Sequence, residues 1–310
     1  MNLIGQALLG VSWFVPVIIY VVINYLGVRS LNKHLANQPD QIKRITVNMF
    51  FCACAGALFA LVTGNLRFDS NTYFVMGVGV LNAFANIMQW RATKVSMSKT
   101  SMLSFGDDII AVLLAWVIIG DGKYLNGVSA SGMVLCLLTG ILFWWHSNKT
   151  KAGKETSSFY FHVLAYCMLW GIAIFSQRYF AFNNLSVAQF VFAWYLGSFL
   201  TMAAIFTGRA VVRTISNSGE KAIAFRFKDY AIVFVYALGI AGGLAIEYWA
   251  KILAPLTVVQ PIFLVSEAVI PTIIGWTIFR ERKTFDRAQW SFSALGFTGV
   301  ILLAFGFHGF

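Results

Sequence analysis

Three carboxylates, Asp107, Asp108 and Glu267, lie inside long apolar stretches of this chain. A charged side chain near the centre of a bilayer is costly, and acidic residues found there commonly carry protons or bind cations. A carboxyl moved from water into an apolar environment tends to take up a proton, whereas a bound cation favours the ionised form. The pattern therefore predicts a site for protons or for a cationic group, with Asp107 and Glu267 as its first members.

Structural roles compete with this interpretation at Asp107 and Asp108. Asp107 could instead pair with a basic residue about two helical turns away, such as Arg91, Lys94 or Lys99. Asp108 points about 100° away from Asp107 on a helix, and for Asp108 the structural and functional roles are equally open.

Glu267 lies between Pro261 and Pro271. Proline removes a backbone hydrogen bond and opens a kink in a helix. A kinked helix that carries a carboxylate in mid-membrane is typical of a transporter site, and a structural ion pair is the alternative.

Further polar side chains inside apolar stretches are candidates for lining a binding site. Asn82 and Asn86 share one helix face and Gln89 follows one turn later; such amides either join helices or line a cavity. Glu247 and Lys251 have the spacing of a helical ion pair with the acid first, so mutual neutralisation near the outer surface competes with substrate contact. The weaker candidates, which could equally be packing or interfacial residues, are Tyr20, Asn24, Trp170 and Gln177.

Composition indicates the elements that must position these residues. Of 310 residues, 59% are hydrophobic and 11% are charged, against about 25% charged in an ordinary soluble domain. Stretches of about 20 apolar residues are long enough to cross a bilayer as helices. The sequence contains ten, of which the second and third are the weakest: Ile4 to Leu26, Asn48 to Thr63, Tyr73 to Trp90, Thr100 to Ile119, Tyr124 to Trp145, Phe159 to Phe180, Ala188 to Thr207, Tyr230 to Ala250, Thr257 to Phe279 and Gln289 to His308. We therefore predict an all-α polytopic membrane protein with ten transmembrane helices.

The basic residues are divided unequally between the two sides of the membrane. The chain has 23 Lys and Arg against 12 Asp and Glu, and only Arg67, Lys123, Arg178 and Lys251 fall in the even-numbered connections. Cytoplasmic loops carry the excess of basic residues, so we expect odd-numbered connections in the cytoplasm and both termini outside, in a bacterial inner (plasma) membrane. This segregation argues against a nucleic-acid partner.

An internal repeat of 160 residues organises the chain. The shift aligns the fourth and fifth helices with the ninth and tenth, and it matches Asp107 with Glu267 and Asp121 with Glu281, whereas Asp108 meets Ala268. We predict a five-helix repeat at 1–145, a cytoplasmic linker at 146–158 and a second five-helix repeat at 159–310. An odd number of helices per repeat inverts the second one, as in transporters that work by alternating access.

Motifs in the last two helices of each repeat resemble a known family. IIGDGKYLNGVSASGMVLCLLTGILF in the first half and TIFRERKTFDRAQWSFSALGFTGVILLAF in the second are similar to the signature of the drug/metabolite transporter superfamily, in its ten-helix EamA-like branch. The resemblance implies that Asp121 and Glu281 close the fourth helix of each half. It also implies a central cavity lined by helices one, three, four, six, eight and nine, with helices five and ten peripheral.

Two features depart from the family pattern. Its ten-helix members usually have cytoplasmic termini, and Asp107 and Glu267 do not belong to its general signature. For Asp121 and Glu281, which lie beside Lys123 and Lys283, capping or a surface ion pair is the simplest expectation.

These observations predict a secondary transporter for a small metabolite that has no bound cofactor and is not an enzyme. Two interior acids without a clear mid-membrane Arg or Lys favour an amine or amino-acid-like substrate, drug-like compounds included, with proton coupling. The expected partners are this substrate and membrane lipid, and a homodimer is left open. One alternative is a non-transporting scaffold, which predicts fixed basic partners for both acids and no cavity. An intramembrane aspartyl protease is disfavoured, because Gly106, Asp107 and Asp108 have no Tyr-Asp partner inside a span.

Overall fold

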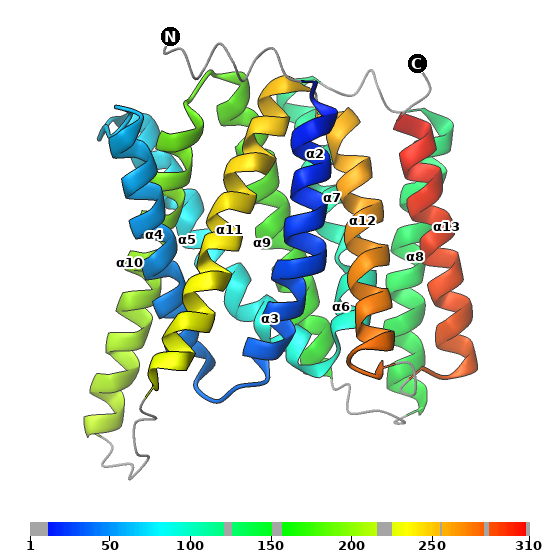
Figure 1. Cartoon of the computed structure of the whole chain (residues 1–310). Coiled ribbons are helices and arrows are strands. Elements are labelled where there is room, and N and C mark those ends of the chain that lie inside the picture. The colour runs from blue at the N-terminus through cyan, green and yellow to red at the C-terminus, as the bar shows by residue number, and fades with distance from the viewer. Residues whose placement is uncertain are drawn as a thin grey trace.

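The computed structural model describes residues 12–120, 126–150, 157–215, 225–254, 256–281 and 285–307, and in these ranges the chain is helical without strands (Figure 1). The first half contains α2 (Phe14–Tyr20), the π-helix η1 (Val21–Val28), α3 (Arg29–Ala36), α4 (Gln41–Val62), α5 (Ser70–Val95), α6 (Met97–Leu103), α7 (Phe105–Leu114), the π-helix η2 (Ala115–Ile119) and α8 (Gly127–Thr150). The second half contains α9 (Ser157–Phe182), α10 (Val187–Ile215), α11 (Phe227–Leu253), α12 (Leu256–Thr277) and α13 (Arg287–Phe307).

Six helices in the described ranges are long and apolar enough to cross a membrane, and they make the chain an integral membrane protein by length and composition. They are Phe14–Ala36, Gln41–Val62, Met97–Ile119, Ser157–Phe182, Val187–Val212 and Phe227–Leu253. These correspond to the first, second, fourth, sixth, seventh and eighth predicted spans. Helices α8 and α12 contribute the shorter apolar stretches Ala130–Phe143 and Ile262–Thr277.

The first helix extends ten residues beyond its predicted end at Leu26, to Ala36. The prediction ended the helix before Arg29 and Lys33 because charged residues usually mark a loop. In the structure both side chains are paired inside the protein, Arg29 with Glu267 and Lys33 with Glu281. A buried charge is tolerated when it is paired in this way, so the helix continues.

The helix that carries Asp107 is interrupted, and the helix that carries Glu267 is not. Between α6 and α7, Ser104 donates its hydroxyl to the Ser101 carbonyl at 2.8 Å, and such local bonds compete with helical backbone bonds. The prolines of the ninth span predicted a kink there, yet α12 runs from Leu256 to Thr277 as one helix. The break in the backbone before Asp107 was not predicted from the sequence, and the kink predicted beside Glu267 stays a prediction.

Helix packing places α8 and α13 side by side at one edge of the bundle (Figure 1), as the resemblance implied for helices five and ten. A Cβ atom at Gly299 of α13 would lie 3.0 Å from the Gly132 carbonyl oxygen of α8 and 2.9 Å from the Cys136 sulfur. Small residues permit this close approach of two backbones. The predicted linker is shorter than expected, because α8 continues to Thr150 and α9 begins at Ser157.

Glu281 closes one end of the bundle. Its carboxylate pairs with Lys33 Nζ at 2.8 Å and accepts the backbone N–H groups of Met97 at 3.0 Å and Ser98 at 2.8 Å. Burial alone would raise the pKa of the Glu281 carboxyl, but Lys33 and these backbone donors hold it below its ordinary value. Glu281 thus caps the start of α6, which agrees with the expected capping role. The alternative expectation, an ion pair on the surface, is wrong in position because only 8% of the residue is exposed. Asp121, Lys123 and Lys283 lie outside the described residues.

Replacing Glu281 with Gln should lower the free energy of unfolding by about 3 kcal/mol, because Lys33 would remain buried without a counter-charge. Thermal unfolding in detergent measures this effect, and the Lys33→Met/Glu281→Gln pair should recover part of the loss. Because folding lowers the pKa of Glu281, its contribution is complete above the ordinary glutamate pKa of about 4.3 and is lost as the pH falls below it. The difference between wild type and Glu281→Gln should therefore close in acid. Equal melting temperatures at neutral pH would contradict this account.

Candidate functional site

A cavity of about 70 Å³ lies among the helices and has carboxylates from both halves of the chain on its wall. Its lining comes from the first helix and from α5, α7, α9, α11 and α12, the six helices that the resemblance implied, with Tyr195 of α10 in addition. Asp107 and Glu267 both belong to this lining. The two acids matched by the repeat therefore share one cavity.

The first helix contributes a stripe of side chains spaced four residues apart. Tyr20, Asn24, Val28 and Asn32 all line the cavity. In an α-helix each step of four residues overshoots one turn by about 40°, so such a stripe would drift away from the cavity. The π-helical turns of η1, which hold more residues per turn, reduce this drift; π-helical segments often occur at functional sites.

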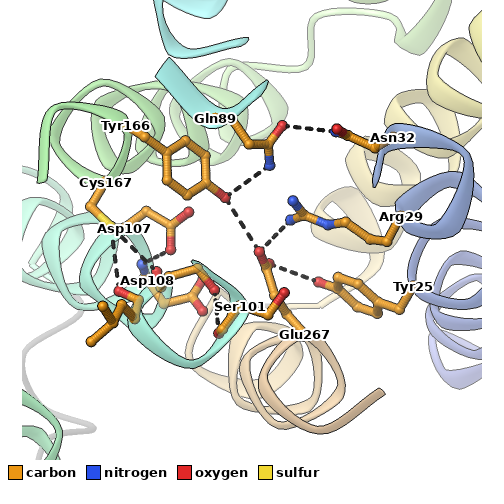
Figure 2. A network of polar contacts seen from close by, with 12 residues as sticks. Tyr25, Arg29, Asn32, Gln89, Ser101, Asp107, Asp108, Tyr166, Cys167 and Glu267 are labelled. Atoms are coloured by element: carbon orange, nitrogen blue, oxygen red, sulfur yellow. Dashed lines mark hydrogen bonds and ion pairs between the residues drawn. The ribbon is translucent and has the colours of Figure 1, made fainter. Parts of the chain in front are cut away.

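The Glu267 carboxylate is the centre of the polar network (Figure 2). It forms an ion pair with Arg29. It also accepts the hydroxyl of Tyr25 at 3.4 Å and that of Tyr166 at 3.3 Å. Donors from the first helix and from α9 thus converge on a carboxylate carried by α12.

Amides extend this network to α5. Gln89 Nε2 donates to the Tyr166 hydroxyl at 3.3 Å, and Asn32 Nδ2 donates to Gln89 Oε1 at 3.4 Å (Figure 2). The chain of contacts from Glu267 through Tyr166 and Gln89 to Asn32 crosses the cavity wall. Hydrogen bonds therefore link the Glu267 carboxylate of α12 to side chains of α9, α5 and α3.

Asp107 and Asp108 both line the cavity and are 2% and 4% exposed. Asp107 accepts the Asp108 backbone N–H at 2.8 Å, and Asp108 accepts a hydrogen bond from the Gln260 side-chain amide. Among the described residues neither acid has a Lys or Arg within ion-pair distance. The structural pairing of Asp107 with Arg91, Lys94 or Lys99 is therefore not found. Asp108 shares the cavity although its repeat counterpart is an alanine.

Asn82 and Asn86 combine the two roles that the sequence left open. Asn82 Nδ2 donates to Ser198 Oγ of α10 at 2.8 Å, and Asn86 Nδ2 donates to Asn82 Oδ1 at 2.9 Å. Both asparagines line the cavity as well. Asn82 therefore joins α5 to α10 while it lines the cavity, whereas the hydrogen bonds of Asn86 stay within α5.

Glu247 and Lys251 form the predicted ion pair, with Nζ and Oε1 2.5 Å apart. Lys251 also donates to Gln177 Oε1 of α9 at 2.5 Å, and its side chain is fully buried. The predicted ion pair is therefore present, and it is buried between helices. Glu247, Tyr20, Asn24 and Trp170 line the cavity, as predicted. Gln177 is not among the lining residues, and it is joined to Glu247 only through Lys251.

Sequence reasoning missed several lining residues. The missed polar or aromatic members are Tyr25, Arg29, Asn32, Tyr166, Tyr195, Tyr236, Gln260 and Phe263. The sequence pattern places Arg29 in a loop because this residue follows the predicted end of the first helix. Tyr166 had a usable signal, since it precedes the candidate Trp170 by one turn on the same helix face.

Comparison with known proteins supports the fold alone. The chain matches no family model and no curated protein. Of the solved structures, 26 chains match. One of them, described only as a crystal structure of a protein, superposes with a TM-score of 0.57 over 94% of this chain and 94% of its own, at 15% sequence identity. The helix arrangement therefore exists in a protein solved by crystallography.

Gly171 of α9 lets the two helices beside Asp107 approach each other. A Cβ atom there would lie 2.6 Å from Ile110 Cβ and 2.9 Å from the Asp107 carbonyl oxygen. By contrast, a Cβ at Gly77 of α5 would meet nothing within 4 Å.

We expect Gly171→Ala to cost about 2 kcal/mol of stability, because overpacking must separate α7 from α9. Gly77→Ala is the matched control, and it should be neutral or stabilising by up to about 1 kcal/mol, since alanine favours helix. Thermal unfolding of both variants in the same detergent makes the comparison. If Gly171→Ala melts like Gly77→Ala, the close contact beside Asp107 is not the constraint that the structure indicates.

Proposed function

We propose that the protein is a secondary transporter built from two inverted five-helix repeats, residues 1–145 and 159–310, that moves a small metabolite by alternating access. The observation that carries the proposal is the shared cavity. Asp107 and Glu267, which the repeat matches, line one interior space together with aromatic rings and amides. Ligand sites of inverted-repeat transporters lie at such repeat interfaces.

Charge on the cavity wall favours a substrate with a cationic group. Asp107, Asp108, Glu247 and Glu267 supply four negative charges when ionised, while Arg29 and the Lys251 that pairs with Glu247 supply two positive charges. The sum, −4 + 2 = −2, is compensated by an amine or by protons. We therefore propose an amine or amino-acid-like substrate and proton coupling through Asp107, Asp108 and Glu267.

Contacts at the two ends of the cavity support alternating access. At one end Glu281, from the second half, holds Lys33 and the start of α6. At the other end Lys251 of α11 holds Gln177 of α9, and Arg178 donates to the Lys251 carbonyl at 2.8 Å. Both sets are buried polar contacts. Water could take the place of the hydrogen-bond partners at whichever end of the cavity opens. Figure 1 places the C-terminal ends of α3 and α12 at the bottom and the C-terminal ends of α9 and α11 at the top.

A non-transporting scaffold is the second candidate, and one observation favours it. Glu267 has a fixed basic partner in Arg29, as a scaffold predicts. The scaffold hypothesis also requires a basic partner for Asp107 and the absence of a cavity. Asp107 has no Lys or Arg within ion-pair distance among the described residues, and it shares a cavity with Glu267. These two observations favour the transporter over the scaffold.

Replacing Asp107 with Asn and Glu267 with Gln together should abolish proton-coupled flux of the substrate in proteoliposomes, because no carboxylate of the matched pair could then bind a proton. Asp286→Asn is the matched control: this acid pairs with His146 at 2.7 Å, and its side chain is 46% exposed. The control should transport normally. Unchanged flux in the double variant would remove the coupling role of the two acids.

We also propose a bacterial inner membrane location with the odd-numbered connections in the cytoplasm. In a background that lacks Cys54, a cysteine at Ser157 should be shielded from an impermeant thiol reagent in intact cells, and one at Asn183 should react. Both positions are exposed, at opposite ends of α9. The reverse labelling pattern would invert the proposed orientation and leave the cavity chemistry unchanged.

A further inference from the structure

Arg29 is the one basic side chain among the described residues that line the cavity. Its side chain and that of Glu267 are 14% and 11% exposed, so this pair lies inside the protein and borders the interior space. A site that served only cations would bind them more strongly without a guanidinium. The presence of Arg29 therefore requires a reason beyond the recognition of an amine.

The groups around Glu267 form a complete recognition site for a carboxylate. The Arg29 guanidinium binds one oxygen, and the hydroxyls of Tyr25 and Tyr166 lie within 3.4 Å of the two oxygens. Guanidinium groups are preferred partners of carboxylates because their planar donors match two oxygens. A carboxylate from outside would be held by the same three donors that now hold Glu267.

We propose that Glu267 occupies the position of a substrate carboxylate and exchanges with it on Arg29. This inference rests on the proposed transport function and narrows its substrates to molecules that carry a carboxylate. In the exchange the substrate carboxylate takes the place of Glu267 on the guanidinium, and Glu267 takes up one proton at its carboxyl oxygen. The proton comes from a hydronium ion or a buffer acid in solution, whose bond to it breaks as the Glu267 O–H bond forms, and the net charge of the cavity stays the same.

The position of the other acids fits a substrate with two ends. In Figure 2, Asp107 and Asp108 lie on the opposite side of the Glu267 carboxylate from Arg29. A molecule whose carboxylate binds Arg29 could therefore direct an ammonium group toward the aspartates, which have no described basic partner. Arg29 would select for the carboxylate, and the proton on Glu267 would enter the transport cycle with each molecule.

Acetate tests the exchange without knowledge of the substrate, and acetamide is its uncharged control. Calorimetry on the detergent-purified protein, in buffers of different ionisation enthalpy, measures both affinity and proton uptake. For the wild type we expect one proton taken up per acetate, with an affinity for acetate that weakens as the pH rises. Acetamide should not bind.

Two variants isolate the competing carboxylate and its partner. Glu267→Gln should bind acetate more tightly than the wild type at neutral pH and without proton uptake, because no resident carboxylate competes for Arg29. Arg29→Met/Glu267→Gln, which removes both charges and leaves no unpaired one, should not bind acetate. Thermal stabilisation by acetate provides a second readout, since a ligand that binds only the folded state raises the melting temperature.

Three results would overturn the exchange: wild-type binding of acetate without proton uptake, loss of acetate binding in Glu267→Gln, or retention of it in the double variant. A folding defect in Glu267→Gln would leave the proton uptake of the wild type to decide. The outcome is separable from transport itself. Flux without carboxylate exchange refutes this inference alone, whereas exchange without flux refutes the proposed transporter.

Discussion

The ion pair between Arg29 and Glu267 is the interaction on which the interior of this protein depends. Each charge alone would be strongly unfavourable among apolar helices, and removal of one partner from a buried pair commonly costs about 3–5 kcal/mol. Because the pair joins the first helix to α12, it connects segments 238 residues apart in the sequence. The hydroxyls of Tyr25 and Tyr166 then find their places around the same carboxylate. The contacts that satisfy the buried Glu267 carboxylate thus bring together residues of the first helix, α9 and α12.

Local departures from regular helix serve this arrangement. The π-helical turns of η1 keep Asn24, Val28 and Asn32 on the cavity wall. The interruption at Ser104 lies three residues before Asp107. Close helix contact at Gly171 brings Tyr166 and Trp170 of α9 beside α7, and it is possible only without a side chain at that position. Irregular backbone is tolerated at membrane depth where protein, and not lipid, surrounds it.

The sequence was sufficient to predict the all-helical class, most helix positions and the presence of Asp107 and Glu267 as candidates for one site. Hydropathy and the 160-residue repeat carry that information because both depend on residue type alone. They could not place Arg29, since a basic residue after an apolar run reads as a loop unless its partner is known. That partner, Glu267, is distant in sequence, so the pair is a property of tertiary packing. The same limit applies to Glu281, whose partner Lys33 also lies in the other half.

The repeat also shows that sequence symmetry does not imply equal chemistry. Asp107 and Glu267 are matched by the repeat, yet only Glu267 faces a guanidinium, while Asp107 has Asp108 as its neighbour. Two adjacent carboxylates repel each other when both are ionised, so protonation of one relieves the repulsion. A carboxylate held by arginine is stabilised in its ionised form until a competing anion arrives. Under the proposed function, the two halves would therefore bind protons differently: the aspartates would respond to proton concentration directly, and Glu267 would respond to the ligand on Arg29.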